Sequence, residues 1–192
     1  MPECNDAVTI RRATPDDAQM LVVLRGLPST IRHQPTMQYD LAMQKQLLRE
    51  SAARAENPNT SGKLHWIVEH DGLPAGGPAG WISLDITQRD QAIGSIGYTL
   101  DPAFHGKRIA SRAARLLVAI AFDPRGLALE RLEAVASVHN IASHRVLEAA
   151  GFQREGIARG LLRVQGVRVD HYRYGLLCTD LPAPQVPEPG DS

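Results

Sequence analysis

The sequence has no excess of charge of either sign. Its 21 Lys and Arg residues balance 21 Asp and Glu residues, which gives a formal net charge of zero and an isoelectric point near 7.1. A neutral chain creates no global positive field that would attract nucleic acid or an anionic membrane. The composition therefore argues against a nucleic-acid partner. Only a local basic patch would allow the chain to bind one.

Cysteine is scarce as well. Cys4 and Cys178 lie near opposite ends of the chain, and neither belongs to a CxxC pair or a Cys/His cluster. A disulfide scaffold or a structural zinc site depends on such spacing. The sequence therefore predicts no metal site and favours a reducing, cytoplasmic setting.

Long hydrophobic runs are missing. No segment approaches the ~18 uninterrupted apolar residues that a membrane helix needs. The first residues, MPECNDAVTIRR, lack the basic and apolar regions of a secretion signal. We expect a protein that has no membrane partner and is not exported by an N-terminal signal.

The chain does have enough apolar residues for one folded domain. It contains 192 residues, of which 43% are hydrophobic, and a chain of this size closes a core without disulfides or metal. The last eleven residues, 182–192, hold four prolines and two acids. Such a segment has little to bury, so we predict one domain over 1–181 and a disordered tail over 182–192.

The N-terminal half predicts two helices and four strands. A strand over 8–13 leads into Thr14-Pro15-Asp16-Asp17, a typical helix start, and the helix should run to about residue 25. A loop with Pro28 and Pro35 precedes a second helix over 39–56. Alternating or apolar runs then predict strands over 64–70, 79–87 and 93–100, which we expect to pair antiparallel.

The C-terminal half predicts a parallel unit followed by a hairpin. Residues 109–122 form a strongly amphipathic helix pattern, residues 129–138 a strand, and residues 141–150 a helix closed by Gly151. Strand, helix and strand in this order indicate a βαβ unit. Strands over 152–164 and 167–177 flank a Gln165-Gly166 turn. The predicted fold is α+β, with a mixed, mostly antiparallel sheet flanked by helices.

The most informative segment is YTLDPAFHGKRIASRA, residues 98–113, where a strand ends and a helix begins. The free amides of a helix N-terminus bind anions, and Gly106 allows close approach of the backbone to a ligand. Lys107, Arg108 and Arg112 add positive charge, so the loop suits a pyrophosphate. The alternative is an ordinary turn before a solvated basic helix start. Neither GxGxxG nor GxxxxGK[ST] is present, so neither NAD nor ATP is favoured.

This segment resembles the acyl-CoA pyrophosphate loop of the GNAT N-acetyltransferases. His105 stands where that family usually has Gln or Arg, Arg108 stands where it usually has Gly, and Ala110 fits the family pattern. An Arg is tolerated there if its φ is negative, because a Cβ then causes no strain. The loop residues that would contact the cofactor are His105, Gly106, Lys107, Arg108, Ile109, Ala110 and Arg112.

A second segment, residues 140–156, resembles the NxxSxxVLExxGFxxEG signature of the ribosomal-protein-alanine N-acetyltransferase branch. By themselves, Asn140 and Ser143 could be only a helix cap. The segment GVRVDHYRYGLL also resembles the last strand of that branch. The resemblance spans roughly residues 8–177.

The resemblance implies a GNAT fold that binds acetyl-CoA. In this family two adjacent parallel strands splay apart, and the pantetheine arm lies in the gap. The thioester oxygen would accept a backbone N–H near Tyr98 to Leu100. Gly94 and Gly97 suit a bulge or a close ligand approach at this strand. Asn140 would hold the pantetheine, and Ser143 would hydrogen-bond or protonate the departing sulfur.

The sequence pattern identifies the general base less clearly than the cofactor-binding residues. Glu133 alternates with Leu132 and Ala134 on its strand, so it points to the opposite face and could face the gap. We name Glu133 as the candidate base. The alternative is an ordinary exposed strand carboxylate.

Together these features predict transfer of an acetyl group from acetyl-CoA to a primary amine by direct attack in a ternary complex. The resemblance implies a protein N-terminal amine as acceptor. The alternatives are a non-catalytic acyl-CoA-binding regulatory module and an acetyltransferase for small molecules such as antibiotics or polyamines. Whether the chain forms a homodimer stays open.

The remaining histidines and tryptophans receive plainer interpretations. His65 and His70 are five residues apart and would point to opposite faces of a strand, so we interpret them as solvated rather than metal ligands. Trp66 and Trp81 are interpreted as packing residues. Four histidines cluster around the proposed site and are interpreted mainly as packed or rim residues: His105, His139, His144 and His171.

Overall fold

The computed structural model describes residues 7–35, 40–57, 59, 61–71 and 78–181. The predicted tail over 182–192 lies outside these residues. The described strands form one sheet of seven strands, β1 (Val8–Arg12), β2 (Gly62–His70), β3 (Pro78–Gln88), β4 (Ile93–Leu100), β5 (Arg131–Ser137), β6 (Gln153–Val164) and β7 (Val167–Leu177). The α-helices are α1 (Ala18–Gly26), α2 (Pro28–Ile31), α3 (Leu41–Ala55), α4 (Ile109–Phe122) and α5 (Ile141–Ala149).

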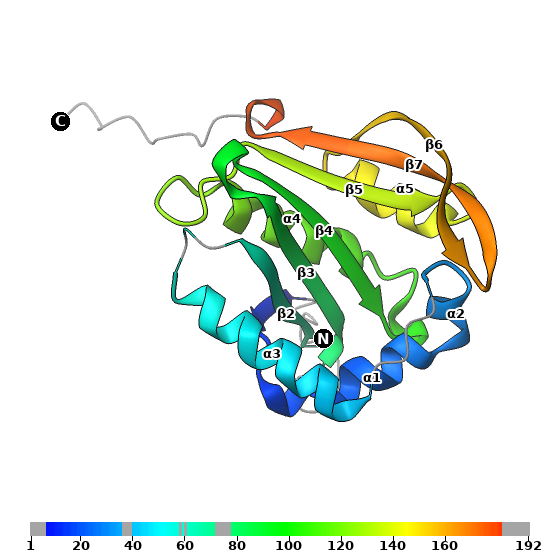
Figure 1. The fold of residues 1–192 in the computed structure, drawn as a ribbon, viewed down its shortest axis with the longest axis horizontal. Helices are drawn as coiled ribbons and strands as arrows, with labels where there is room; N and C mark the ends of the chain where they lie inside the picture. The colour runs from blue at the N-terminus through cyan, green and yellow to red at the C-terminus, as the bar shows by residue number, and fades with distance from the viewer. Residues whose placement is uncertain (1–6, 36–39, 58, 60, 72–77, 182–192) are drawn as a thin grey trace, which may run out of the picture.

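The sheet order is β1-β2-β3-β4-β5-β7-β6 (Figure 1). Neighbouring strands pair antiparallel except β4 and β5, which are parallel and are connected through α4. This confirms the predicted α+β class and the predicted βαβ unit. A crossover helix is required between parallel neighbours, because a tight turn can join only antiparallel strands.

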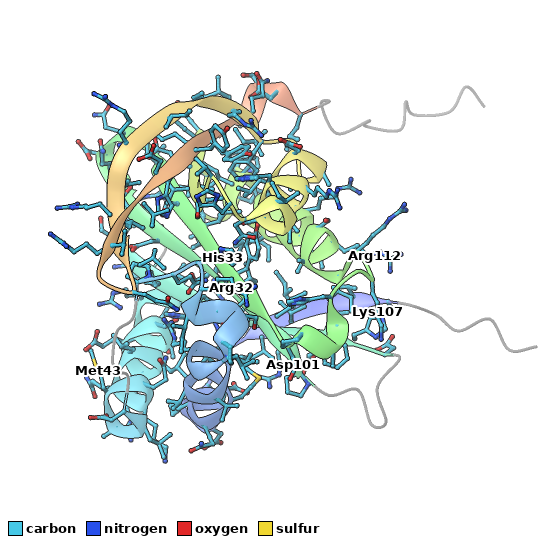
Figure 2. The ribbon with its side chains drawn as sticks, turned by 90° about the vertical axis from the view of Figure 1, so that its right-hand side faces the viewer. Arg32, His33, Met43, Asp101, Lys107 and Arg112 are labelled. Carbon is cyan, nitrogen blue, oxygen red and sulfur yellow. The ribbon has the colours of Figure 1, made fainter. Side chains whose placement is uncertain are left out.

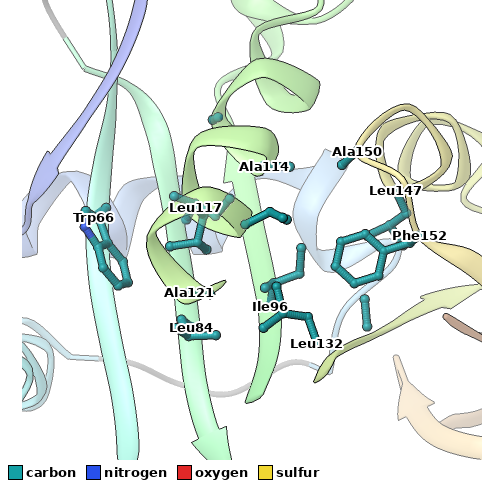
Figure 3. Packing of buried hydrophobic residues seen from close by; sticks show 14 of the residues in the cluster. Trp66, Leu84, Ile96, Ala114, Leu117, Ala121, Leu132, Leu147, Ala150 and Phe152 are labelled. Atoms are coloured by element: carbon teal, nitrogen blue, oxygen red, sulfur yellow. The ribbon is translucent and has the colours of Figure 1, made fainter. Parts of the chain in front are cut away.

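One face of the sheet is covered by α4 and α5. Alternate residues of the strands point to this side and pack on the apolar stripe of α4, as their spacing predicts. Figure 3 shows this core, in which Leu84, Ile96, Leu117, Leu132 and Phe152 are each at most 8% exposed.

The opposite face, called the α1/α3 face below, is covered in part by those two helices. Leu21 and Leu24 of α1 and Leu48 of α3 pack with Ile67 and Trp81 in a second, smaller core. The other set of alternating strand residues points to this side. It includes Glu133, because its neighbours Leu132 and Ala134 lie in the main core.

The structure adds two details to the first helical region. Residues 15–17 form a 3-10 turn before α1, and Asp17 accepts a hydrogen bond from the Thr14 backbone N–H at 2.7 Å. The segment predicted as a loop contains the short helix α2. Pro28 begins α2, because a proline needs no N–H partner in the first helical turn. The Thr30 hydroxyl donates to the Leu24 carbonyl at 2.8 Å and so holds α2 against α1.

Candidate functional site

The sheet opens between β4 and β5. These two strands pair only over Ile93 to Ser95 of β4 and Arg131 to Glu133 of β5. Beyond that point β4 continues to Leu100, whereas β5 stays paired with β7 up to Ser137. The pairing therefore ends where the strands diverge, and the backbone of β4 after Ser95 has no strand partner on the β5 side. The predicted splay is present (Figure 1).

Gly94 and Gly97 play different parts at the splay. A Cβ at Gly94 would lie 2.9 Å from side-chain carbons of both Leu84 and Leu129, so this glycine is required by packing at the closed end. A bulge does occur, but in the partner strand β3, between Ile86 and Gln88. A Cβ at Gly97 would meet only the Ser83 hydroxyl at 3.5 Å. Gly97 therefore leaves space on the α1/α3 face beside the gap.

The loop from β4 to α4 ends at the mouth of this gap. The Asp101 carboxylate accepts from the Ala103 backbone N–H at 2.9 Å, and a His105 ring nitrogen lies 3.3 Å from the Leu100 carbonyl oxygen. Figure 2 shows Lys107 and Arg112 together at the N-terminal end of α4. The first α-helical N–H of α4 with a backbone partner is that of Arg112, which donates to the Arg108 carbonyl. The amides before it are the free donors expected at a helix N-terminus.

Arg108 does not meet the condition under which an Arg is free of strain at this position. That condition is a negative φ, whereas the φ of Arg108 is +59°, in the left-handed region. Gly106 also has a positive φ, +79°, and a Cβ there would meet nothing within 4 Å. The loop therefore turns twice through conformations that glycine adopts without strain. This explains why the family pattern has Gly where this chain has Arg108.

Ser143 and Tyr98 meet across the gap. The Tyr98 hydroxyl lies 2.8 Å from the Ser143 hydroxyl and 3.2 Å from the Ser143 carbonyl oxygen. Burial raises the pKa of the Tyr98 phenol far above its usual range, with the Ser143 hydrogen bond as a smaller opposing effect. The phenol is therefore a permanent O–H donor. When it donates to Ser143, the serine proton is left to point elsewhere.

Asn140 caps α5. Its side-chain oxygen accepts from the Ser143 backbone N–H at 3.1 Å, which is the bond expected of an N-cap asparagine. The cap uses the carbonyl oxygen of the amide, and the NH₂ group is a separate donor. Asn140 can therefore cap the helix and donate to a ligand at the same time.

A buried pair fixes the start of α5 on the sheet. The His144 Nδ1 atom lies 3.0 Å from the Tyr174 hydroxyl, and its Nε2 atom lies 3.3 Å from the Val138 carbonyl oxygen. Nε2–H donates to that carbonyl, so Nδ1 accepts from the phenol. His144 is 4% exposed, and the pair holds the helix that carries Ser143.

Glu133 lies at the fork of the splay, on the α1/α3 face. It is the last β5 residue in register with β4, opposite Ser95. Arg131 donates to its carboxylate at 3.1 Å and to Glu155 at 2.6 Å. The register continues from Ser95 to Asp85 and from Asp85 to Lys63. Glu133 therefore belongs to a polar row, Lys63, Asp85, Ser95 and Glu133, that crosses four strands.

The mouth of the gap is flanked by α2 on the α1/α3 face. The Gln34 amide donates to the Thr99 hydroxyl at 3.3 Å, so the chain after α2 contacts the end of β4. His33, labelled in Figure 2, precedes Gln34 in this segment. Burial, and then the charges of Arg32 and His139, lower the pKa of His33. A neutral His33 therefore lies near His139, which follows β5.

The structure brings most of the predicted residues to one gap. Tyr98, the loop after it, Asn140 and Ser143 lie along its edges, and Glu133 lies at its closed end. The sequence did not reveal the Tyr98 side-chain contact with Ser143. A signal was available, because Tyr98 alternates with the core residues Ile96 and Leu100 and so places a hydroxyl on the core face.

The interpretation of His65 and His70 as solvated is wrong. They are 3% and 6% exposed, because α3 covers one end of β2 and β1 pairs with the other. His171 is 2% exposed and His144 is 4% exposed, as expected for packed residues, and Trp66 and Trp81 are buried as predicted. None of the described helices is long and apolar enough to cross a membrane.

Comparison with known proteins identifies the family. Residues 7–153 match the model of the acetyltransferase (GNAT) domain. The chain belongs to the GNAT acetyltransferase family. This confirms the predicted GNAT fold and the expectation of an N-acetyltransferase with acetyl-CoA as its co-substrate.

Relatives of known sequence support this assignment. The chain is 47% identical over 85 residues to "Probable N-acetyltransferase YjcK" of Bacillus subtilis (strain 168), a match that covers 44% of this chain and 46% of that protein. The chain therefore spans about half the length of this relative. It is 30% identical over 187 residues to "Putative ribosomal N-acetyltransferase YdaF" of the same organism, which covers 90% of this chain and 92% of that protein.

Solved structures share the fold. The ribosomal-protein-S5-alanine acetyltransferase of Vibrio fischeri superposes with a TM-score of 0.75 at 24% identity, over 88% of this chain and 92% of that one. RimJ of Mycobacterium smegmatis, solved with CoA-disulfide, gives 0.77 at 23% identity, over 91% and 84% of the two chains. At this identity the likeness concerns the fold.

Proposed function

We propose that this GNAT enzyme acetylates the N-terminal amine of a protein or peptide by direct attack in a ternary complex. The observation that supports this proposal best is the opening between β4 and β5, with the Ser143 hydroxyl on one edge and the Glu133 carboxylate at its closed end. Both reactants then have a place: acetyl-CoA along the gap, and the amine from the α1/α3 face.

In this proposal acetyl-CoA is held by three parts of the chain. The amides and cations at the start of α4, with Gly106, Lys107, Arg108 and Arg112, take the pyrophosphate and the nearby phosphate. The unpaired backbone of β4 between Ile96 and Leu100 pairs with the pantetheine amides and the thioester oxygen. A backbone N–H aimed at the developing oxyanion contributes about 2.7–4 kcal/mol in other acyl transfers. The Asn140 amide donates to the pantetheine.

The chemistry requires removal of one proton from the amine and stabilisation of the departing thiolate. The amine attacks the thioester carbon, the C–N bond forms, and the C–S bond then breaks to release the CoA thiolate. Ser143, held by the protonated Tyr98 phenol, donates its hydrogen bond to the departing sulfur. Glu133 accepts the proton that the amine loses, directly or through a water molecule.

An N-terminal amine needs only a weak general base. Its unperturbed pKa is about 7.7–8.0, so roughly a tenth of it is already neutral at pH 7, whereas a lysine amine with a pKa of about 10.4 is neutral in fewer than about one in a thousand molecules. Glu133 is half-exposed and shares Arg131 with Glu155, which is a weak arrangement for deprotonating lysine. The relative YdaF, which matches over 92% of its length and is named "Putative ribosomal N-acetyltransferase", supports the same acceptor class.

The test is release of free CoA from acetyl-CoA in the presence of different acceptors. We expect turnover with short peptides that have a free N-terminus, none with the same peptides blocked at the N-terminus, and less with lysine, spermidine or an aminoglycoside. Initial rates measured against both substrates should give intersecting double-reciprocal lines, as a ternary complex requires. Parallel lines would contradict direct attack. Binding of acetyl-CoA without turnover of any acceptor would favour a non-catalytic module.

A further inference from the structure

A polar cavity lies outside the gap. It is open to solvent, is lined by α1, α3 and the strands β2 and β3, and has a volume of about 320 Å³. Its lining combines two apolar residues of α3 with charged residues and one histidine. The lining residues are Arg25, Met43, Leu47, Glu50, Arg54, Lys63, His65 and Asp85. None of the steps proposed above uses this cavity.

His65 is the unusual member of this lining. It is 3% exposed, and its backbone N–H donates to the Ser51 hydroxyl at 2.9 Å. Both ring nitrogens are buried, and neither has a hydrogen-bond partner among the described residues. The Trp81 indole N–H and the Gln44 amide, buried in the same region, also lack partners. An unpartnered buried polar group lowers stability, so a histidine at this position needs a reason other than packing.

The surroundings of His65 are positive. Burial, and then the charges of Arg25, Lys63 and Arg54, lower the pKa of His65 to about 3. The two carboxylates of the cavity each have a cation beside them: Glu50 lies 3.3 Å from Arg54, and Asp85 lies 3.5 Å from Lys63. The Arg25 guanidinium lies over the Trp81 ring at 4.6 Å. The cavity therefore offers a neutral imidazole with one N–H donor, and its three cations outnumber its two carboxylates by one.

The cavity adjoins the proposed acceptor side of the sheet. Asp85 and Lys63, which line it, belong to the polar row that ends at Glu133. Asp85 and Glu133 are two strands apart, which is about 10 Å at the usual strand spacing. An extended chain advances about 3.3–3.6 Å per residue, so the side chain of the second or third residue of a bound peptide can reach from the amine to the cavity.

We propose that this cavity binds a carboxylate of the acceptor, with the His65 imidazole N–H as donor and Lys63, Arg25 and Arg54 as the surrounding cations. This inference rests on the proposed function and narrows its substrate class to acceptors with an acidic group near the amine. The carboxylate is the side chain of an acidic residue close to the N-terminus of a peptide. A free small carboxylate that binds beside the acceptor has the same chemistry, and the experiment distinguishes the two.

The first arm compares two peptides with amidated C-termini, Ala-Glu-Glu-Ala and Ala-Gln-Gln-Ala. We expect the wild-type enzyme to have a KM about tenfold lower for the acidic peptide. His65→Leu should remove this preference and leave the KM for acetyl-CoA unchanged. Since leucine deletes two unpartnered polar atoms, the same variant should melt at a higher temperature than the wild type. This combination separates a binding role from a structural one.

Two further variants distinguish loss of carboxylate binding from a general effect on folding. Lys63→Met changes a half-exposed side chain and should also weaken the acidic preference. Arg49→Met removes one cation from the exposed side of α3, away from the cavity, and should leave the preference intact. If His65→Leu raises the melting temperature and leaves both peptide KM values unchanged, the cavity holds only water and the inference is wrong.

The second arm uses glutarate alone, without acetyl transfer. If the wild type acetylates neither peptide, the proposed acceptor is wrong, and glutarate then tests the cavity separately. Stabilisation of the wild type against heat by glutarate, compared with chloride at equal ionic strength and absent in His65→Leu, would mean that a free carboxylate is the ligand if the enzyme shows no preference for the acidic peptide. No stabilisation by glutarate together with equal KM values for the two peptides would overturn the carboxylate site altogether.

Discussion

The hydroxyl of Ser143 has a neighbour that decides how it works. Tyr98 comes from β4 and Ser143 from α5, yet their hydroxyls are 2.8 Å apart. The phenol pKa is raised by burial, so the tyrosine does not itself release a proton near neutral pH. Tyr98 is therefore a positioning residue, which orients the serine hydroxyl, and Ser143 is the candidate that contacts the sulfur.

We predict that Ser143→Ala lowers kcat and kcat/KM together, by ~10–100-fold, and leaves the affinity for acetyl-CoA nearly unchanged. The hydroxyl contact strengthens as charge develops on sulfur, and one hydrogen bond to a charged group contributes about 1.5–3 kcal/mol. Steady-state kinetics and a direct acetyl-CoA titration would measure these effects. If turnover persists while only the melting temperature falls, Ser143 is a first-turn helix residue and not a catalytic one.

Tyr98→Phe is the matched control for this prediction. It keeps the ring and removes the hydroxyl, so kcat should fall less than in Ser143→Ala. The double variant should lose no more activity than Ser143→Ala alone, because the tyrosine acts through the serine. Additive losses would instead give Tyr98 a role of its own in the reaction.

The origin of this pair shows what the sequence could predict at the scale of residues. Asn140 and Ser143 were named because their local segment resembles a family signature, and the loop cations because they lie at a predicted helix N-terminus. The contacts of Tyr98 with Ser143 and of Tyr174 with His144 join residues 45 and 30 positions apart. The local alternation places the Tyr98 hydroxyl on the core face, but only the tertiary arrangement of β4, α5 and β7 decides which residues these hydroxyls meet.

Among the elements, the loop before α4 combines a strained backbone with a charged side chain. Arg108 has a φ of +59°, a conformation that costs a non-glycine residue roughly 1–2 kcal/mol. Replacement by glycine relieves this strain and adds backbone entropy to the unfolded chain, an opposing effect of about 0.5–1 kcal/mol. The expected net effect favours glycine.

We therefore predict that Arg108→Gly raises the free energy of unfolding by roughly 0.5–1 kcal/mol, measured by urea denaturation. Lys107→Gly is the matched control, since Lys107 is equally exposed and has no positive φ. It should lower the stability by a similar amount. If both glycine variants are destabilised alike, the left-handed conformation at residue 108 does not strain the protein.

The α5 cap allows a second prediction at this scale. Asn140→Ala removes both the cap and the amide donor, so it should lower stability by about 1 kcal/mol and raise the Kd for acetyl-CoA. Asn140→Asp keeps a good cap and removes the NH₂ donor, so stability should stay near that of the wild type while the Kd still rises. Thermal melts and acetyl-CoA titrations of both variants would measure this. If only the alanine variant binds poorly, Asn140 acts through the helix alone.

Elements were predicted well where their sequence pattern was long. The bounds of β4 and α4 agree with the prediction, since each has a sustained apolar period and a clear stop. The short helix α2 was not predicted, because four residues that begin with proline show no period, and its place depends on contacts with Leu24 and Thr99. The φ of Arg108 could not be read either, since it follows from how the loop closes onto α4.

At the scale of the whole molecule, the sheet is held together by only three residue pairs between β4 and β5. On one side of this junction lie β1 to β4 with α1, α3 and α4, and on the other lie β5 to β7 with α5. The junction is supplemented by contacts of α4 with α5 and by the Tyr98–Ser143 hydrogen bond. A ligand that lies along the gap would therefore join the two halves of the sheet.

We accordingly predict that acetyl-CoA raises the melting temperature substantially. A ligand that binds only the folded state stabilises it by about 2.7 kcal/mol when its concentration is 100 times its Kd. For a domain of this size each kcal/mol shifts the melting temperature by about 2–4 °C, so the expected rise is about 5–11 °C. A thermal scan at millimolar acetyl-CoA measures it, with ATP and NAD at equal concentration as controls for phosphate charge alone. Equal shifts with all three nucleotides would mean that only the basic loop binds, because the pantetheine arm, which lies between the strands in the proposed complex, is absent from ATP and NAD.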